Sequence, residues 1–215
     1  MIALLRRGLT RVRTAHVVAA ATADGVTVRN VGDEELAAGS VTALELTESA
    51  KSFGELRLII VGGKTYAIPP PSWHVPGKPW ALITEQTTNQ FVVALAQSIP
   101  SLEAALSPSS FPIFVAAATS VTSDGTAKIG SILARRYSVL SNVKRLPQTF
   151  PPRGDLYLDV SQLPIELWLD PQGALMMAQE TYTVNAQSVT KTLTLTNVGE
   201  RLSISAPPAS QVASG

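Results

Sequence analysis

Short runs of strand-forming residues fill this chain on both sides of one long helical stretch, and this pattern restricts the fold more than any other feature. The runs are rich in Val, Leu, Ile, Thr and Tyr and are separated by turn residues. Before the helical stretch they predict strands at 15–22, 26–31, 40–47, 55–61 and 64–68. After it they predict strands at 119–123, 134–141, 164–169, 174–183, 188–197 and 201–205.

The strands alternate between apolar and polar positions, which is typical of a sheet with one buried face. In the strand at 55–61, Leu56, Leu58 and Ile60 share one side, and Glu55, Arg57 and Ile59 share the other. This favours antiparallel pairing. Asp24-Gly25 and Gly62-Gly63 predict hairpin turns, because their residues tolerate positive φ. Asp124-Gly125 and residues 170–173 also predict turns.

Three helical segments are expected. Residues 2–13 carry apolar side chains at steps of three and four, with arginines between them, and predict an amphipathic helix that Gly8 weakens slightly. The long stretch begins with a capping box at 87–90, carries an apolar stripe, and is broken or kinked at Pro100 before it continues to 106. Residues 112–118 predict the third helix, with Pro112 in its first turn.

Two proline-rich loops, 69–80 and 144–155, separate these elements. We expect Trp73 and Trp80 to hold the first loop against the body. No change in composition is wide enough to be a linker, so the 215 residues predict one domain, 1–215, with a frayed tail at 206–215.

Composition excludes several classes of protein. The formal net charge of +1 gives no basic stripe for nucleic acid. With no cysteine, the chain has no disulfides, zinc–thiolate sites or cysteine nucleophiles. No run approaches the length of a membrane span, and the apolar residues at the N-terminus precede the arginines, which is the wrong order for a signal peptide.

The chain offers little material for catalysis, and we expect no enzyme, no metal and no cofactor. Gly63-Lys64-Thr65 lacks the earlier glycine of a phosphate-binding loop, and Leu133 stands where a nucleophile elbow needs glycine. His16 and His74 are expected to be structural. Glu34-Glu35 is interpreted as a solvated turn, Arg135-Arg136 as a pair that straddles both faces, and Glu166 and Asp170, which flank Trp168, as a solvent-facing row.

The chain does have more apolar residues, on more faces, than a thin sheet needs. Helices that are apolar on several faces are buried between layers or line an apolar space. A sheet that curls around such helices can enclose an apolar pocket. From composition alone, an ordinary filled core is favoured over such a pocket.

The order of the motifs resembles the LppX/LprAFG family of actinobacterial (mycobacterial-type) lipoproteins, members of the wider LolA-like superfamily. The resemblance covers essentially the whole chain. It is carried by the hairpin at 54–66 followed by a tryptophan, the helix at 95–106, and the strands at 130–139 and 164–170, with the closing stretch at 192–208. Each motif alone is weak, whereas the shared order and spacing are more specific.

The resemblance implies an α+β fold: a strongly curved antiparallel sheet, a half-barrel, with helices packed in its concave face. It further implies an apolar cavity for the acyl chains of lipids or glycolipids, with no catalytic residues. Family members are tethered to the outer face of the cytoplasmic membrane through a lipidated N-terminal cysteine. Because this sequence has no cysteine, either the signal peptide and lipobox have been removed or this protein is not anchored in that way.

The cavity wall is expected to consist of the inward-facing apolar residues Leu44, Leu46, Leu58, Ile60, Phe91, Leu95, Ile99, Phe114, Val139, Leu167, Leu193 and Leu195. Each of them also suits an ordinary core. A polar head group would lie at the mouth, near the Trp73–Trp80 loop. Each buried CH₂ of an acyl chain contributes about 0.8 kcal/mol, so extraction from a membrane is feasible.

Two functions stay open at this point. The first is a monomeric lipid or glycolipid carrier of the cell envelope that meets the membrane surface and an envelope transporter partner. The second is a protein-interaction or sensor module on the same fold with a filled core. The volume of the cavity and the presence of co-purified lipid distinguish them.

Overall fold

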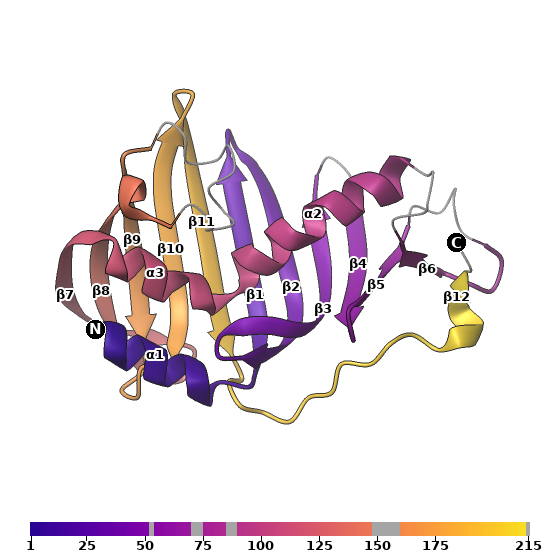
Figure 1. The fold of residues 1–215 in the computed structure, drawn as a ribbon, viewed down its shortest axis with the longest axis horizontal. Coiled ribbons are helices and arrows are strands. Elements are labelled where there is room, and N and C mark those ends of the chain that lie inside the picture. Colours follow the sequence, from indigo (N-terminus) through magenta and orange to yellow (C-terminus); the bar gives the residue numbers. More distant parts are fainter. Residues whose placement is uncertain (52–53, 70–74, 85–89, 148–159, 214–215) are drawn as a thin grey trace.

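The computed structural model describes residues 1–51, 54–69, 75–84, 90–147 and 160–213, and the side chains within them except those of residues 90 and 91. Within these ranges, twelve strands form one sheet in the order β12-β6-β5-β4-β3-β2-β1-β11-β10-β9-β8-β7 (Figure 1). All neighbouring pairs are antiparallel except β12 and β6, which are parallel. The α+β class with a curved antiparallel sheet is therefore confirmed.

The strands are bounded as follows: β1 Thr14–Ala23, β2 Val26–Ala37, β3 Ser40–Ala50, β4 Gly54–Val61, β5 Lys64–Ile68, β6 Trp80–Ile83, β7 Ala118–Ile129, β8 Ile132–Asn142, β9 Gln162–Leu169, β10 Leu175–Val184, β11 Gln187–Thr196 and β12 Val212–Ala213. The helices are α1 Ile2–Arg11, α2 Gln90–Leu106 and α3 Phe111–Ala116, with short 3-10 turns η2 Pro108–Ser110, η3 Val143–Arg145 and η6 Ala209–Gln211.

Tight turns connect the predicted hairpins. Asp24 and Gly25 join β1 to β2 with φ values of 50° and 73°, the mirror-image turn that suits the twist of paired strands. Gly62 and Gly63 join β4 to β5 in the same way. Between β9 and β10, Asp170 closes the predicted turn by accepting hydrogen bonds from the backbone N–H groups of residues 172 and 174.

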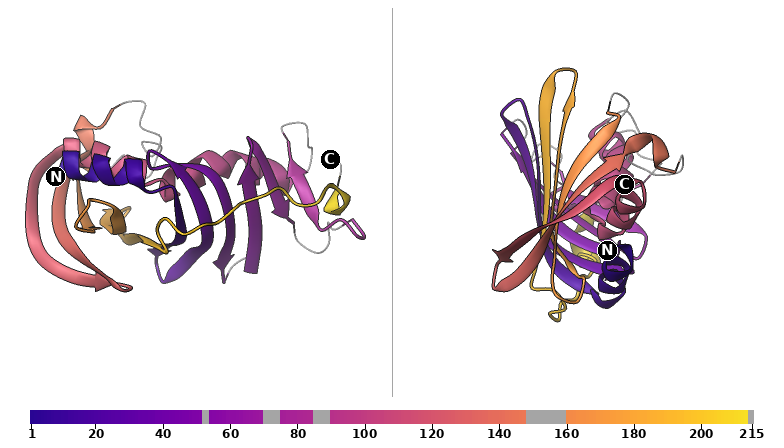
Figure 2. Two further views of the ribbon diagram at one scale, coloured as in Figure 1. Left: turned by 90° about the horizontal axis from the view of Figure 1, so that it is seen from below. Right: turned by 90° about the vertical axis from the view of Figure 1, so that its left-hand side faces the viewer.

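The three helices lie on one face of the sheet, the concave one, as expected (Figure 2). We call this face the inner face; it carries Val17, Leu46 and Leu58. Helix α2 crosses the sheet over the middle of its strands, whereas α1 and α3 cover its other half near β8 to β10 (Figure 1). Pro100 lies inside α2, so the helix continues through the predicted break. Of the predicted capping box at 87–90, residues 87–89 lie outside the described residues, and Gln90 is the first residue of α2.

The C-terminal segment packs on part of the opposite, outer face, over β3, β4, β5 and β6. Ile204 packs with Ile59, Tyr66 and Trp80, which all point away from the helices. The backbone N–H of Ile204 donates a hydrogen bond to the Glu35 carboxylate at 3.2 Å. The predicted strand at 201–205 is therefore wrong, because this segment crosses the strands instead of running beside one of them (Figure 2).

The end of the chain also differs from the frayed tail that was expected at 206–215. Residues Ala209–Gln211 form η6, and Val212 pairs in parallel with Trp80 at the edge strand β6. A free sheet edge offers unpaired backbone groups, and the tail supplies partners for them. Strand β6 begins at Trp80, the last residue of the loop that the sequence predicts at 69–80.

The dipeptide Asp124-Gly125 is not a turn, contrary to the prediction. It forms a bulge inside β7, where the register shifts between Ser123 and Thr126, and Gly125 adopts φ 96°. A bulge needs a residue of unusual backbone conformation just as a turn does, so the same dipeptide suits both. The chain reverses instead at Gly130, between β7 and β8.

Candidate functional site

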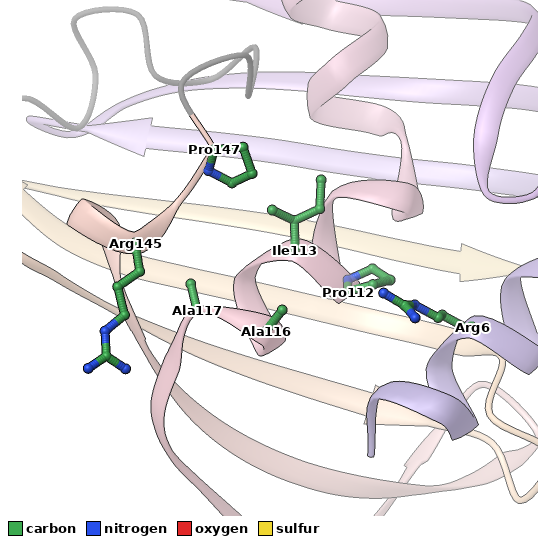
Figure 3. A pocket seen from close by; sticks show the side chains of 7 residues that line it. All are labelled: Arg6, Pro112, Ile113, Ala116, Ala117, Arg145 and Pro147. Carbon is green, nitrogen blue, oxygen red and sulfur yellow. The ribbon is translucent and has the colours of Figure 1, made fainter.

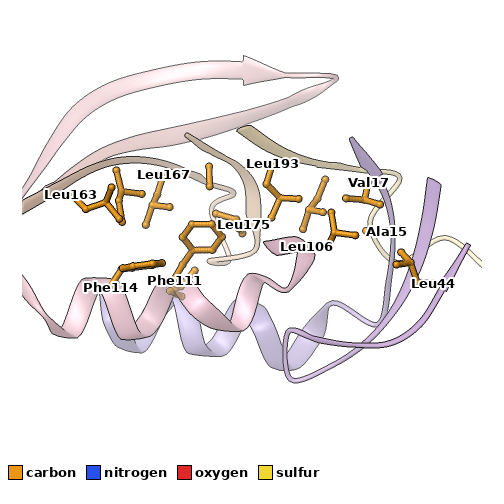
Figure 4. Close-up of a cluster of buried hydrophobic side chains, with 14 of the residues drawn as sticks. Ala15, Val17, Leu44, Leu106, Phe111, Phe114, Leu163, Leu167, Leu175 and Leu193 are labelled. Carbon is orange, nitrogen blue, oxygen red and sulfur yellow. The ribbon is translucent and has the colours of Figure 1, made fainter. Parts of the chain in front are cut away.

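The inner face brings the predicted wall residues together in one buried cluster (Figure 4). Strands far apart in the sequence contribute to it because β1 pairs with both β2 and β11, which joins the two halves of the sheet. Eleven of the twelve residues belong to this cluster: Leu44, Leu46, Leu58, Ile60, Leu95, Ile99, Phe114, Val139, Leu167, Leu193 and Leu195. The side chain of the twelfth, Phe91, lies outside the described residues.

The cluster is closely packed beneath the helices. The exposed fraction of its eleven wall residues is between 0% and 8%. Phe111 and Phe114 of α3 face the sheet together, with ring centres 6.3 Å apart (Figure 4). That these side chains line a lipid cavity stays a prediction.

Further along the same strands, the inner face is more open. Ala19, Ala21, Val28 and Val189 point to the same side as the cluster but are only half-buried. In Figure 1, β10, β11, β1 and β2 extend beyond α2 at this end. The inner face therefore has a covered half, lined by apolar side chains, and a half-open half, where apolar side chains lie beside polar ones.

Polar side chains also lie within the half-open part. Lys191 of β11 lies directly opposite Glu180 of β10, and its Nζ lies 5.5 Å from the ring centre of Tyr182. On β3, burial raises the pKa of Glu48, and a hydrogen bond with the Asn30 side chain opposes that rise. An amphiphile on this surface would find apolar contacts and hydrogen-bonding groups.

Glu34 is the residue that sequence reasoning missed. The sequence predicts a solvated turn at Glu34-Glu35, but Glu34 lies within the long strand β2, on the inner face, with no exposed surface. Burial raises the pKa of its carboxyl group from 4.5 to about 8. Extending the two-residue alternation of 26–31 through Gly32 would have placed Glu34 on the same side as Val28.

A pocket of about 250 Å³ opens where α1, α3 and η3 meet (Figure 3). Ile113, Ala116 and Ala117 form its apolar wall, with Arg6 at one end and Arg145 at the other. Ala117 also belongs to the buried cluster, and Ile113 packs against it. Both arginines are exposed, and no carboxylate of the described residues forms an ion pair with either. The pocket thus combines two uncompensated cations with a wall that continues into the core.

The outer face holds the other polar groups that the sequence singles out. His16 Nδ1 lies 2.9 Å from Asp33 Oδ1. Glu166 accepts hydrogen bonds from Arg136 Nε at 2.6 Å and from the Ser138 hydroxyl at 2.7 Å. Arg136 also lies over the ring of Trp168, at 5.6 Å. These contacts tie neighbouring strands together.

The expected head-group position is not supported at Trp80, because this tryptophan packs on the outer face. Trp73 and His74 lie outside the described residues. In the part of the chain that is described, no three His, Cys, Asp or Glu side chains gather closely enough to hold a metal ion. Within that same part, no helix is both long and apolar enough to cross a membrane.

Comparison with known proteins shows the fold. No protein-family model matches the sequence, and no curated protein matches it. Among solved structures, the lipoprotein LppX of Mycobacterium tuberculosis superposes with a TM-score of 0.56 at 15% identity, over 95% of this chain and 97% of LppX. LprF of Mycobacterium bovis superposes with a TM-score of 0.53 at 12% identity, over 96% of each chain. The chain therefore has the same fold as LppX and LprF.

Proposed function

We propose that this protein is a non-catalytic lipid or glycolipid carrier of the cell envelope. The observation that carries the proposal is the shared fold with LppX, which is described as a lipoprotein, over nearly the full length of both chains. The inner face supports it, because helices pack over its apolar layer, and a sheet that curves around apolar helices can enclose an apolar pocket. We infer that the protein works as a monomer at the outer side of the cytoplasmic membrane.

The acyl chains would lie between the helices and the inner face of the sheet. The pocket at Arg6 is smaller than the 300–1,000 Å³ that is common for small-molecule sites, so it suits a head group and not a whole lipid. To admit the acyl chains, α2 and α3 would move away from the sheet. Burial of a sixteen-carbon chain would then contribute on the order of 10 kcal/mol before the costs of binding.

The head group would be anionic and would lie between Arg6 and Arg145. Guanidinium groups bind carboxylates and phosphates through paired hydrogen bonds. The apolar wall at Ile113 continues into the cluster, so the first methylene groups of an acyl chain would follow it inward. The membrane surface and an envelope transporter would be the donor and the acceptor of the lipid.

Native mass spectrometry of the purified protein, with lipid analysis of an organic extract, tests the proposal. We expect a bound mass that is identified as an acylated lipid. A ligand-free mass that resists loading with added lipids would contradict it. The double variant Arg6→Glu, Arg145→Glu should bind an anionic phospholipid several-fold more weakly, whereas Arg7→Glu, an exposed neighbour on α1, should not.

A charged residue in the wall gives a second test. Leu58→Glu would place a carboxylate on the inner face, where Leu58 is 1% exposed. If that variant stays folded and its co-purified lipid is unchanged, Leu58 does not line the site. The same substitution at Phe91, the twelfth residue that the sequence predicts for the wall, would test that prediction in the same way.

A protein-interaction or sensor role is the second candidate, and the close packing of the cluster favours it. Side chains such as Leu44 and Leu167 have no exposed surface, which is also what an ordinary filled core would give. If lipids neither co-purify nor load, the same fold would act through its surface on a protein partner.

A further inference from the structure

Glu34 is buried among apolar side chains without a partner. Its neighbours across the sheet are Ala15 on β1 and Leu44 on β3, and all three residues are 0% exposed. Neither Oε1 nor Oε2 of Glu34 reaches a hydrogen-bond donor or acceptor. A carboxyl group in such surroundings is rare, because desolvation is costly unless hydrogen bonds replace the lost water.

Nothing in the described fold requires a carboxyl group at this position. A buried polar group without a partner destabilises a protein by about 1–3 kcal/mol. An apolar residue would also suit the strand better, because glutamate is among the residues depleted in strands. The carboxyl group therefore lowers stability and contributes no bond, which points to a partner that is bound from outside the chain.

At neutral pH the Glu34 carboxyl group holds its proton, because burial raises its pKa to about 8. A neutral carboxyl group offers one O–H donor and one carbonyl acceptor. No cation lies close enough to form an ion pair with it among the described residues. Its preferred partner is thus an uncharged group that can both donate and accept a hydrogen bond.

A second polar side chain lies on the same face of β2. Asn30, four residues before Glu34, is 9% exposed, and its Oδ1 has no hydrogen-bond partner. Four residues of a strand span about 13 Å. A chain that lies along β2 would therefore pass two hydrogen-bonding points, with the small side chains of Ala15 and Ala19 beside it on β1.

We propose that Glu34 determines which lipid is bound, by forming hydrogen bonds to a hydroxyl group carried on an acyl chain of that lipid. This inference rests on the proposed lipid-binding function and specifies its ligand. A hydroxyl group can accept a hydrogen bond from the O–H of the Glu34 carboxyl group and donate one to its carbonyl oxygen. It therefore satisfies both polar atoms of Glu34. An ester group could only accept a hydrogen bond, and an unsubstituted acyl chain could neither donate nor accept one.

Discrimination would come from the cost of leaving a polar group unpaired. A site built around a hydrogen bond rejects a ligand that lacks the matching group, because its own buried polar atoms then stay unsatisfied. An unsubstituted acyl chain on Glu34 would leave the carboxyl group buried against methylene groups. We expect a preference of about tenfold for the hydroxylated chain.

The test compares a set of hydroxystearic acids, which differ in the position of the hydroxyl group, with stearic acid. Affinities for the wild type, Glu34→Met and Glu34→Gln would be measured by competition in native mass spectrometry. We expect the wild type to prefer at least one hydroxylated acid about tenfold over stearic acid. Glu34→Met should lose the preference, and Glu34→Gln should keep most of it, because an amide also donates and accepts.

The control variant is Glu55→Met, which makes the same change at an exposed position of β4 and should keep the preference. Equal binding of all the acids by the wild type, or a preference that survives in Glu34→Met, would overturn this inference and leave lipid binding in place. If neither stearic acid nor any hydroxylated acid binds, the proposed function fails and the inference fails with it.

Discussion

Glu34 and Leu44 lie directly opposite each other in the β2–β3 pair, and neither side chain has any exposed surface. An ionisable group thus occupies a position in the sheet where its neighbours are aliphatic. The consequences of this pairing for stability and for pH dependence can be measured without knowledge of any ligand.

Replacing the carboxyl group should stabilise the ligand-free protein. Glu34→Met keeps a similar length and removes two polar atoms that have no partner. We expect a gain of about 1–3 kcal/mol in the free energy of unfolding at neutral pH, measured by urea denaturation. Glu55→Met should change it by less than about 0.5 kcal/mol. A loss of stability in Glu34→Met would show that the carboxyl group has a structural role.

Stability should also fall as the pH rises towards 8. Below pH 4.5 the carboxyl group of Glu34 is protonated in both the folded and the unfolded chain. Between pH 4.5 and about 8, only the folded chain holds the proton, so each added pH unit lowers the free energy of unfolding by about 1.4 kcal/mol. Denaturation of the wild type and of Glu34→Gln across this range measures the effect. Parallel curves for the two proteins would contradict it.

Gly8 should not tolerate a methyl group, although alanine is the better helix former. A Cβ on Gly8 would lie 1.9 Å from the backbone oxygen of Gly173, in the turn between β9 and β10. The gain in helix propensity is about 1 kcal/mol, and the clash with backbone should exceed it. We expect Gly8→Ala to be destabilised by about 1–3 kcal/mol, whereas Arg7→Ala on the exposed side of α1 should be near neutral. A stabilised Gly8→Ala would show that α1 is free to shift.

The C-terminal segment should contribute to stability through Ile204. This residue is 8% exposed and packs on the outer face with Ile59 and Trp80. Ile204→Ala should lower the free energy of unfolding by about 2 kcal/mol, measured by thermal or urea denaturation. The matched control is Ser203→Ala, at an exposed position beside it. Equal stability of the two variants would mean that the segment is only loosely attached.

Local patterns predicted much of the framework. The alternation at 55–61 correctly assigns Leu58 to the inner face and Ile59 to the outer one, because successive side chains of a strand point to opposite faces. The turns at Gly25 and Gly62 follow from their residues alone. The same patterns selected the wall residues, and all eleven that are described lie in one cluster.

Other features could not be predicted, because they depend on neighbours distant in the sequence. The segment 201–205 has the composition of a strand, yet it has no free edge to pair with where it crosses the sheet. Val212 and Ala213 form the strand β12 because they pair with the edge strand β6. Asp124-Gly125 is a bulge and not a turn because β8 is long enough to pair on both sides of it.

The sequence by itself determined the secondary structure class, the two faces of most strands and the apolar character of the site, since these depend on residue type and a period of two. The tertiary structure alone decided that Glu34 is buried, because its surroundings are made by β1 and β3. It also decided that Arg6 and Arg145, 139 positions apart in the chain, flank one pocket. Burial and electrostatic environment are properties of elements brought together in space, and the local order of residues does not contain them.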